Sequence, residues 1–216
     1  MSAKQNLSDI FEADRTMRVA EQELLGTGES ELSPQLAAAV TEAKAMDDEE
    51  EKTMRLQRLA DLCAQVPGPE MTDTLIAILN EDLPTVRVSA ADALVDVAFE
   101  RYAEVARGVE RALDSGEEGM AMGELPWVLT EVAEPSAVKL IARFLKLKDG
   151  SIVASAVEAL ATLGDRSAIE ILEPLKGDPR VVELDEYEGE VAATLGELVD
   201  EAIDLIEQGP AREQAN

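Results

Sequence analysis

The sequence has no histidine and a single cysteine, Cys63, among its 216 residues. Histidine and cysteine supply many general bases and nucleophiles, so the catalytic systems built on them are missing. One cysteine also excludes a disulfide within the chain. The sequence shows neither a glycine-rich phosphate loop nor a recognisable spacing of metal ligands. We therefore expect a protein that is not an enzyme and that uses no cofactor or metal.

Aromatic residues are also scarce, at 3% of the chain, although hydrophobic residues make up 46%. Ala, Leu and Val supply the apolar content, and Ala and Leu are strong helix formers, whereas a layered β protein would carry more aromatic and β-branched residues. No apolar run approaches the roughly 18 residues of a membrane-spanning helix, and the N-terminus lacks the apolar stretch of a signal peptide. The expectation is an all-α protein in a reducing, cytoplasmic compartment.

Basic residues are few as well: 19 Lys and Arg stand against 46 Asp and Glu, which gives a formal net charge of −27. A field of this sign repels nucleic-acid phosphate and anionic lipid, so neither is an expected partner. The same field attracts a basic protein segment. The alternative is an acidic surface whose only role is to keep the chain in solution.

Two helical segments precede the main part of the chain. Residues 7–25 have apolar residues at helical spacing, and a polar linker is expected at 26–33. Residues 1–30 are either a docking helix on a flexible tether or a cap on the structure that follows. Residues 34–66 are expected to form a capping hairpin, whose first helix (34–46) starts with Ser33 as N-cap and Pro34 at the first helical position.

A run of five carboxylates, residues 47–51, separates the two helices of this hairpin. Five adjacent carboxylates point in different directions around a helix, so they do not converge on one metal ion. They are better placed to open helix 52–66, where negative charge complements the helix dipole. Cys63 in that helix is expected to be a small buried residue. Pro67-Gly68-Pro69 then breaks the chain and marks the expected boundary of the next region.

Residues 70–208 repeat themselves. Residues 127–138 align with 158–169 at an offset of 31, and 86–94 align with 152–160 at an offset of 66, about two units. Self-similarity at such a period indicates a solenoid of stacked helix pairs. The expected first helices are 71–80, 103–114, 137–147 and 167–176. The expected second helices are 84–98, 121–133, 151–163 and 186–206, with a frayed tail at 209–216.

Residues 159–169, Ala-Leu-Ala-Thr-Leu-Gly-Asp-Arg-Ser-Ala-Ile, resemble HEAT-like repeats of the phycobilisome-lyase (PBS lyase) type. In those repeats the second helix ends in Gly-Asp, and a small residue, Ala and an aliphatic residue follow. Residues 128–138 match with Ala133 and Glu134 in place of Gly and Asp, and residues 99–102 depart from the usual turn. The resemblance covers roughly 70–206. It implies a right-handed α-solenoid whose second helices line a concave face, and it is weak evidence for function.

Trp127 stands out in this alignment. It precedes Val128-Leu129, whereas the equivalent residues Asp92 and Glu158 are acidic. A lone tryptophan at an otherwise acidic position is a candidate anchor for a binding partner. The alternative is that its ring packs between repeats as part of the core. The polar positions of the second helices, together with Trp127, form the candidate partner-binding set: Arg87, Asp92, Asp96, Glu124, Trp127, Glu131, Ser155, Glu158 and Thr162.

The sequence therefore favours a non-enzymatic protein-binding scaffold or regulatory adaptor that presents an acidic concave surface to a basic or amphipathic protein segment. A phycobilin lyase-like or chaperone-like subunit remains the alternative, because the resemblance implies it. Such a subunit needs a hydrophobic or cationic pocket for the bilin propionates. HEAT-like DNA glycosylases need a positively charged concave face, which the net charge of −27 contradicts.

Overall fold

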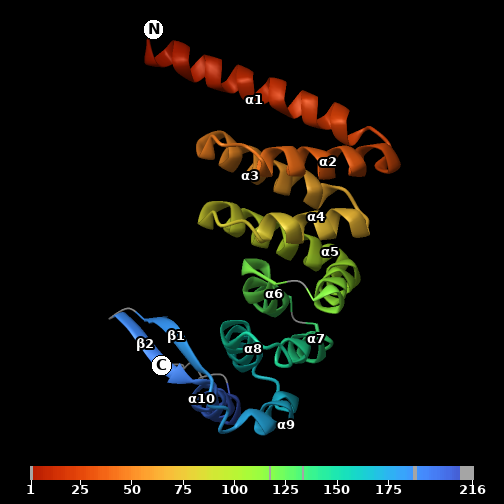
Figure 1. The fold of residues 1–216 in the computed structure, drawn as a ribbon. Coiled ribbons are helices and arrows are strands. Elements are labelled where there is room, and N and C mark those ends of the chain that lie inside the picture. Colours follow the sequence, from red (N-terminus) through yellow and green to blue (C-terminus); the bar gives the residue numbers. More distant parts are fainter. Residues whose placement is uncertain (1, 117, 133, 187–188, 210–216) are drawn as a thin grey trace, which may run out of the picture.

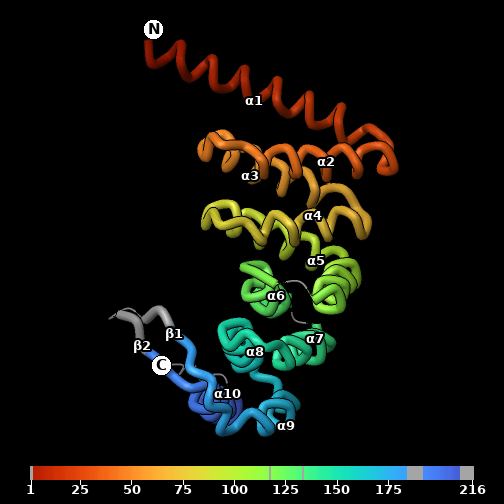
Figure 2. Tube along the Cα trace, in the orientation of Figure 1, coloured from red at the N-terminus to blue at the C-terminus, as the bar shows by residue number. Residues whose placement is uncertain are grey.

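The computed structural model describes residues 2–116, 118–132, 134–186 and 189–209. Helices follow one another as stacked pairs, and α1 extends from one end of the stack (Figures 1 and 2). A single buried apolar cluster runs through the stack from Leu32 to Ile206. The architecture is an α-solenoid, as the repeat pattern predicted.

The helices and strands have the following bounds: α1 Ala3–Leu25, α2 Glu29–Lys44, α3 Glu49–Gln65, α4 Pro69–Leu79, α5 Pro84–Ser115, α6 Met120–Thr130, α7 Ala137–Phe144, α8 Gly150–Leu163, α9 Ser167–Leu172, the 3-10 turn η1 Glu173–Leu175, β1 Val181–Glu186, β2 Gly189–Thr194 and α10 Leu195–Gln208.

The polar linker expected at 26–33 is shorter in the structure, and the prediction that Ser33 caps a helix at Pro34 was wrong. Helix α2 begins at Glu29 with Gly28 as N-cap, and Pro34 lies inside it. The reason is packing: starting the helix early places Leu32 on the same buried face as Leu36. The cost of an interior proline is the loss of one backbone hydrogen bond near the helix start.

The acidic run opens a helix, as expected. Asp48 is the N-cap of α3, and its side chain accepts a hydrogen bond of 3.1 Å from the backbone N–H of Glu51. Glu49, Glu50 and Glu51 occupy the first turn, where carboxylates stabilise the positive end of the helix dipole. Cys63 is fully buried in the same helix, and burial raises the pKa of its thiol to about 12. Its predicted role as a small core residue is confirmed.

The two helices expected at 84–98 and 103–114 form one element, α5, with a kink. Arg101 has non-helical backbone angles there, φ −139° and ψ 48°. Its guanidinium donates a hydrogen bond of 2.9 Å to the carbonyl of Ala64 and pairs with Glu104 at 3.3 Å. The unusual residues 99–102 thus replace the loop of other repeats with a sharp bend.

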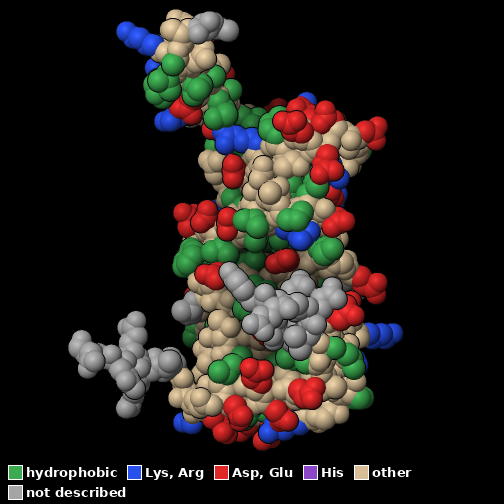
Figure 3. All heavy atoms as spheres, turned by 90° about the vertical axis from the view of Figure 1, so that its left-hand side faces the viewer, with side chains coloured by type: hydrophobic (Ala, Val, Ile, Leu, Met, Phe, Trp, Pro, Cys, Tyr) green, Lys and Arg blue, Asp and Glu red, His purple; other side chains and the backbone are tan. Residues whose placement is uncertain are grey.

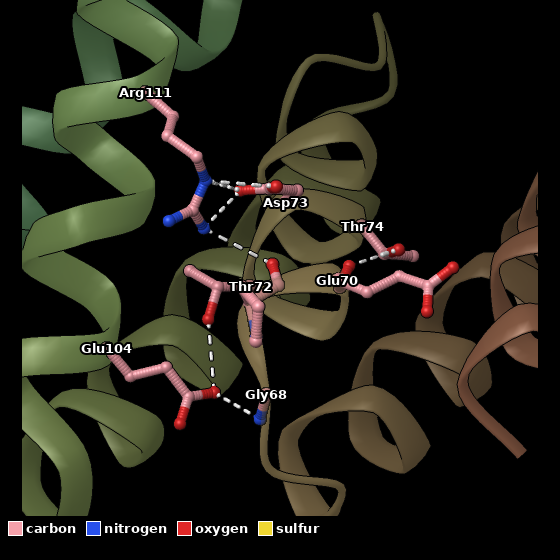
Figure 4. Close-up of polar contacts among 8 residues, drawn as sticks. Gly68, Glu70, Thr72, Asp73, Thr74, Glu104 and Arg111 are labelled. Atoms are coloured by element: carbon pink, nitrogen blue, oxygen red, sulfur yellow. Dashed lines mark hydrogen bonds and ion pairs between the residues drawn. The ribbon is translucent and has the colours of Figure 1, made fainter. Parts of the chain in front are cut away.

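The second half of α5 packs against α4 through polar contacts (Figure 4). The guanidinium of Arg111 donates to the carboxylate of Asp73 at 2.6 Å. A carboxylate oxygen of Glu104 accepts from the Gly68 backbone N–H at 2.9 Å and from the Thr72 hydroxyl at 3.3 Å. Gly108 allows this close approach, because a Cβ atom there would lie 2.4 Å from Cγ2 of Thr72.

The prediction of one helix over 186–206 was wrong in its first half. Strands β1 (Val181–Glu186) and β2 (Gly189–Thr194) pair antiparallel, with Val181 opposite Thr194, and α10 starts only at Leu195. A capping box between Thr194 and Glu197 fixes that start. Val182 is buried and lies against the start of α8, because a Cβ atom at Gly150 would be 3.0 Å from its Cγ1. The all-α solenoid therefore carries a small two-stranded addition.

Three other helices end earlier than expected. Helix α6 ends at Thr130, α7 ends at Phe144, and α9 ends at Leu172 before a 3-10 turn that contains Pro174. Helix α6 nevertheless starts at Met120, so Pro126 lies in its interior. Most of the tail predicted to fray, residues 210–216, lies outside the described residues. The division into a cap at 34–66 and repeats at 70–208 stays a prediction.

Candidate protein-binding groove

A groove of about 1000 Å³ is formed by residues of α6, α8, α10 and β1. In Figure 1 helices α6 and α8 and strand β1 lie toward the left of the stack, the side that Figure 3 turns to the viewer. Four of the nine predicted partner-binding residues line it. The full lining comprises Trp127, Ser151, Ala154, Ser155, Val157, Glu158, Ala161, Thr162, Leu163, Gly164, Val182, Glu183, Leu198, Glu201, Ala202, Leu205 and Gly209.

Helix α8 forms the floor through one of its faces. The α8 residues in the groove, from Ser151 to Thr162, recur at intervals of three and four, as expected for one side of a helix. Buried Ala154 and Val157, with the more accessible Ala161, give this face its apolar content, and Ser155, Glu158 and Thr162 lie beside them. The facing wall from α10 uses the same spacing. Its side chains are Leu198, Glu201, Ala202 and Leu205, and Leu205 is 53% exposed.

Trp127 lies at the α6 side of the groove and is half-buried. The side chain is thus neither fully core nor fully exposed. Its carbonyl accepts a hydrogen bond of 2.7 Å from the Thr130 hydroxyl in the last turn of α6. Pro126, immediately before it, is buried. The tryptophan is therefore held on an ordered helix with one side available to a ligand.

Two glutamates lie together in this groove. Glu158 of α8 is half-buried, and its pKa is raised by burial and by the negative charge of Glu201 on α10. Within the described part of the chain, no ion pair joins either carboxylate to a lysine or arginine. Two like charges without a counter-ion are electrostatically unfavourable, and a cation placed between them would stabilise both.

Asp92 and Asp96 lie in a second concavity of about 840 Å³ between α3 and α5. Asp61, Glu100 and the exposed ring of Phe99 line it as well. The predicted concave-face residues therefore divide between two hollows instead of forming one surface patch.

The three remaining predicted residues line neither hollow. Arg87 is engaged in the structure: it pairs with Glu124 at 3.6 Å and donates to the carbonyl of Glu81 at 3.2 Å. This contact ties α5 to α6. Glu131 is the exposed C-cap of α6. Arg87 and Glu124 thus have a structural role within the chain, and this role does not depend on a binding partner.

Sequence reasoning missed the α10 wall of the groove. Leu198, Glu201, Ala202 and Leu205 recur at helical spacing, so the pattern was present in the sequence. The hairpin before α10 was assigned to the same helix, which obscured where the apolar face of α10 begins. The hairpin also contributes Val182 and Glu183 to the rim.

No group of three or more potential metal ligands comes together within the described residues. In the same portion of the chain, no helix combines the length and the apolar character needed to cross a bilayer. The chemistry of the groove is therefore that of an apolar floor, one indole and a set of carboxylates.

Comparison with known proteins supports the repeat interpretation. Residues 152–183 match the model of the PBS lyase HEAT-like repeat. The chain is 27% identical over 147 residues to the uncharacterized phycocyanin operon protein Z of Pseudanabaena tenuis, and the match covers 66% of this chain and 72% of that protein.

Two crystal structures of engineered proteins are also similar. One is 16% identical with a TM-score of 0.37 and covers 88% of this chain and 97% of its own. The other is 18% identical with a TM-score of 0.40 and covers 81% of this chain and 48% of its own. The chain thus contains a match to the PBS lyase HEAT-like repeat at residues 152–183, and it is similar to a phycocyanin operon protein over 66% of its length; both findings support a HEAT-like repeat protein of the PBS lyase type.

Proposed function

We propose that this chain is a non-enzymatic protein-binding scaffold or regulatory adaptor that presents its acidic concave surface to a protein partner. One observation carries the proposal: Trp127, two glutamates that have no counter-ion among the described residues, and an apolar floor share one open groove. Tryptophan is enriched among the residues that dominate binding energy at protein interfaces. An apolar floor with a few polar groups at its edge is the composition expected of a binding site.

The name of the similar protein indicates which class of partner this scaffold would bind. Protein Z is described as a phycocyanin operon protein. Genes of one operon commonly act together, so a partner among phycobilisome-related proteins fits the scaffold proposal. We propose that residues 70–208 form the binding repeats and that residues 34–66 cap their N-terminal end.

The second candidate is a phycobilin lyase-like or chaperone-like subunit, which the same relative favours. A bilin carries propionate carboxylates, and its site would need cations to hold them. The ionisable side chains among the groove residues are Glu158, Glu183 and Glu201, all acidic. Carboxylates facing carboxylates repel, so the groove favours a protein partner over a bilin. Titration with free phycobilin distinguishes the two, since a saturable absorbance change would favour the bilin site.

The scaffold proposal is tested by affinity capture from cross-linked cells that make this protein. We expect the tagged wild-type chain to retain at least one specific protein, and Trp127→Ala to reduce its recovery about tenfold or more. Met54→Ala is the matched control, because it removes an exposed apolar side chain from α3, outside the groove. Recovery of no specific protein, or equal recovery by all three chains, would contradict the proposal.

A further inference from the structure

The groove has the form that an amphipathic helix needs. Its floor comes from one face of α8 and its wall from one face of α10, so apolar side chains line a trough between two helices. An amphipathic helix binds such a trough through apolar residues spaced three and four apart. Leu205, which is 53% exposed, extends this apolar surface to the outer edge.

The charges around the groove determine what the polar face of that helix must carry. Glu158, Glu183 and Glu201 lie among the lining residues, and no lysine or arginine is found among them. The whole chain carries a formal net charge of −27, so its field adds to the local one. Acidic side chains are spread over the visible face (Figure 3). A second acidic copy of this chain is therefore a poor occupant, and a cationic segment is a good one.

The position of Trp127 adds a preference for arginine. An arginine guanidinium stacks on the face of an indole ring and can bind a carboxylate with two parallel hydrogen bonds. The half-buried indole and the two carboxylates of Glu158 and Glu201 line the same groove. Lysine offers one compact charge and gains less from a flat aromatic surface.

We infer that this groove binds the apolar face of a basic amphipathic helix of a partner protein, with an arginine stacked on Trp127 and paired with Glu158 and Glu201. The inference rests on the proposed scaffold function and names the chemistry of its partner. It leaves the second hollow, around Asp92 and Asp96, outside the site.

The test uses the full chain and a synthetic helical peptide with leucine on one face and arginine on the other. Matched peptides replace every arginine by lysine or by glutamate. Trp127 is the sole tryptophan, so its fluorescence reports binding at the groove itself, and calorimetry gives the affinity. We expect the arginine peptide to bind about tenfold or more tighter than the glutamate peptide, with the lysine peptide between them.

Two double variants distinguish the effect of charges inside the groove from the effect of the overall negative charge of the chain. Glu158→Gln with Glu201→Gln removes two charges inside the groove, and Asp92→Asn with Asp96→Asn removes two outside it. We expect the first pair to weaken the arginine peptide about tenfold and the second pair to change it less than about threefold. Circular dichroism melts check that each variant is folded.

Equal weakening by both pairs, or no preference for arginine over glutamate, would overturn the basic-helix inference. So would a native partner whose capture depends on Trp127 but not on Glu158 and Glu201, and that result would leave the scaffold proposal standing. If capture of a native partner is lost with the Trp127 variant and also with the Glu158 and Glu201 variants, the result supports both the scaffold proposal and the basic-helix inference. Failure to capture any specific partner overturns the scaffold proposal separately.

Discussion

Trp127 and Glu158 occupy the same position in successive repeats, 31 residues apart, and both line one groove. The stacking of repeats explains this, because equivalent positions of neighbouring second helices face the same side of a solenoid. At this position Trp127 adds an indole to a groove whose charged lining residues, Glu158, Glu183 and Glu201, are acidic.

Glu158→Gln should stabilise the fold at neutral pH. Burial and the charge of Glu201 raise the pKa of Glu158 in the folded chain, so ionisation of this carboxyl opposes folding. We expect a gain of about 1 kcal/mol or less, since solvent screens a half-buried group, and a melting temperature higher by about 2–3 °C.

The pH dependence of the stability gain from Glu158→Gln tests whether ionisation of Glu158 is its cause. The difference between variant and wild type should be small below the unfolded pKa of about 4.3 and grow as pH rises through the raised folded value. Thermal melts over this range measure it. Glu170→Gln, at an exposed position on α9, is the control. A variant less stable than wild type at neutral pH would contradict the prediction.

Glu81→Gln should destabilise the fold at neutral pH, the opposite of the effect expected for Glu158→Gln. Burial alone would raise its pKa, but hydrogen bonds from Lys52 and Lys44, at 2.6 and 3.1 Å, outweigh burial and lower it. Glu81→Gln leaves two partly buried cations without their carboxylate and should cost about 1–2 kcal/mol at neutral pH. This contribution is present above the unfolded pKa and is lost as pH falls through the lowered folded pKa. Urea denaturation at several pH values measures it, and a loss that persists unchanged in acid would refute the assignment.

Gly108→Ala should destabilise the chain although alanine is the better helix former. A Cβ atom at this position would lie 2.4 Å from Cγ2 of Thr72, and such overpacking costs about 1–3 kcal/mol. Gly123→Ala is the matched control inside α6. There the nearest atom would be 3.8 Å away, so helix propensity should stabilise by up to about 1 kcal/mol.

The cause of the Gly108 effect can be isolated with a second substitution. Thr72→Ser removes the methyl group but keeps the hydroxyl that donates to Glu104. The double variant should therefore recover most of the stability that Gly108→Ala loses in urea denaturation. Equal destabilisation with and without Thr72→Ser would show that the methyl contact is not the cause.

Proteases should cleave α1 before they cleave the segment that follows, trypsin at its arginines and proteinase K at sites of broad specificity. No residue of α1 is buried, and Leu7 and Ile10 are 54% and 60% exposed. By contrast, the backbone N–H groups of Gly26 and Thr27 are hydrogen-bonded to the last turn of α1, and α2 starts at Glu29. We expect early cuts after Arg15 and Arg18, followed by a stable fragment from residue 19 onward, as judged by mass spectrometry. Residues 26–33 contain no Lys or Arg, so proteinase K is used in parallel with trypsin, and its first cleavage within 26–33 would favour a flexible tether instead.

The repeat period explains how much of the groove the sequence could predict. Ser155, Glu158 and Thr162 lie on one face of α8, and the offset of 31 places Trp127 beside them. The position of Glu201 could not be obtained in this way, since the start of α10 depends on the hairpin. Short apolar runs such as residues 191–193 fit a strand or a helix equally well, and only pairing with β1 decides between them.

The polar residues of the concave face posed a different problem. Spacing shows that Arg87 and Glu124 point away from the core, but it does not show that they pair with each other between α5 and α6. Likewise, Ser33-Pro34 predicted a helix that starts at Pro34, while the burial of Leu32 extends α2 back to Glu29. Both outcomes depend on contacts between elements distant in sequence, which local patterns do not contain.

Site-specific photo-cross-linking in cells tests the central claim most directly. A photoreactive residue at position 162 lies in the groove, and one at position 170 lies at an exposed position of α9 that does not line the groove. The scaffold account predicts a discrete cross-linked protein from position 162 that is absent from position 170 and is lost with Trp127→Ala. Cross-links of equal pattern from both positions, or none from position 162, would contradict it.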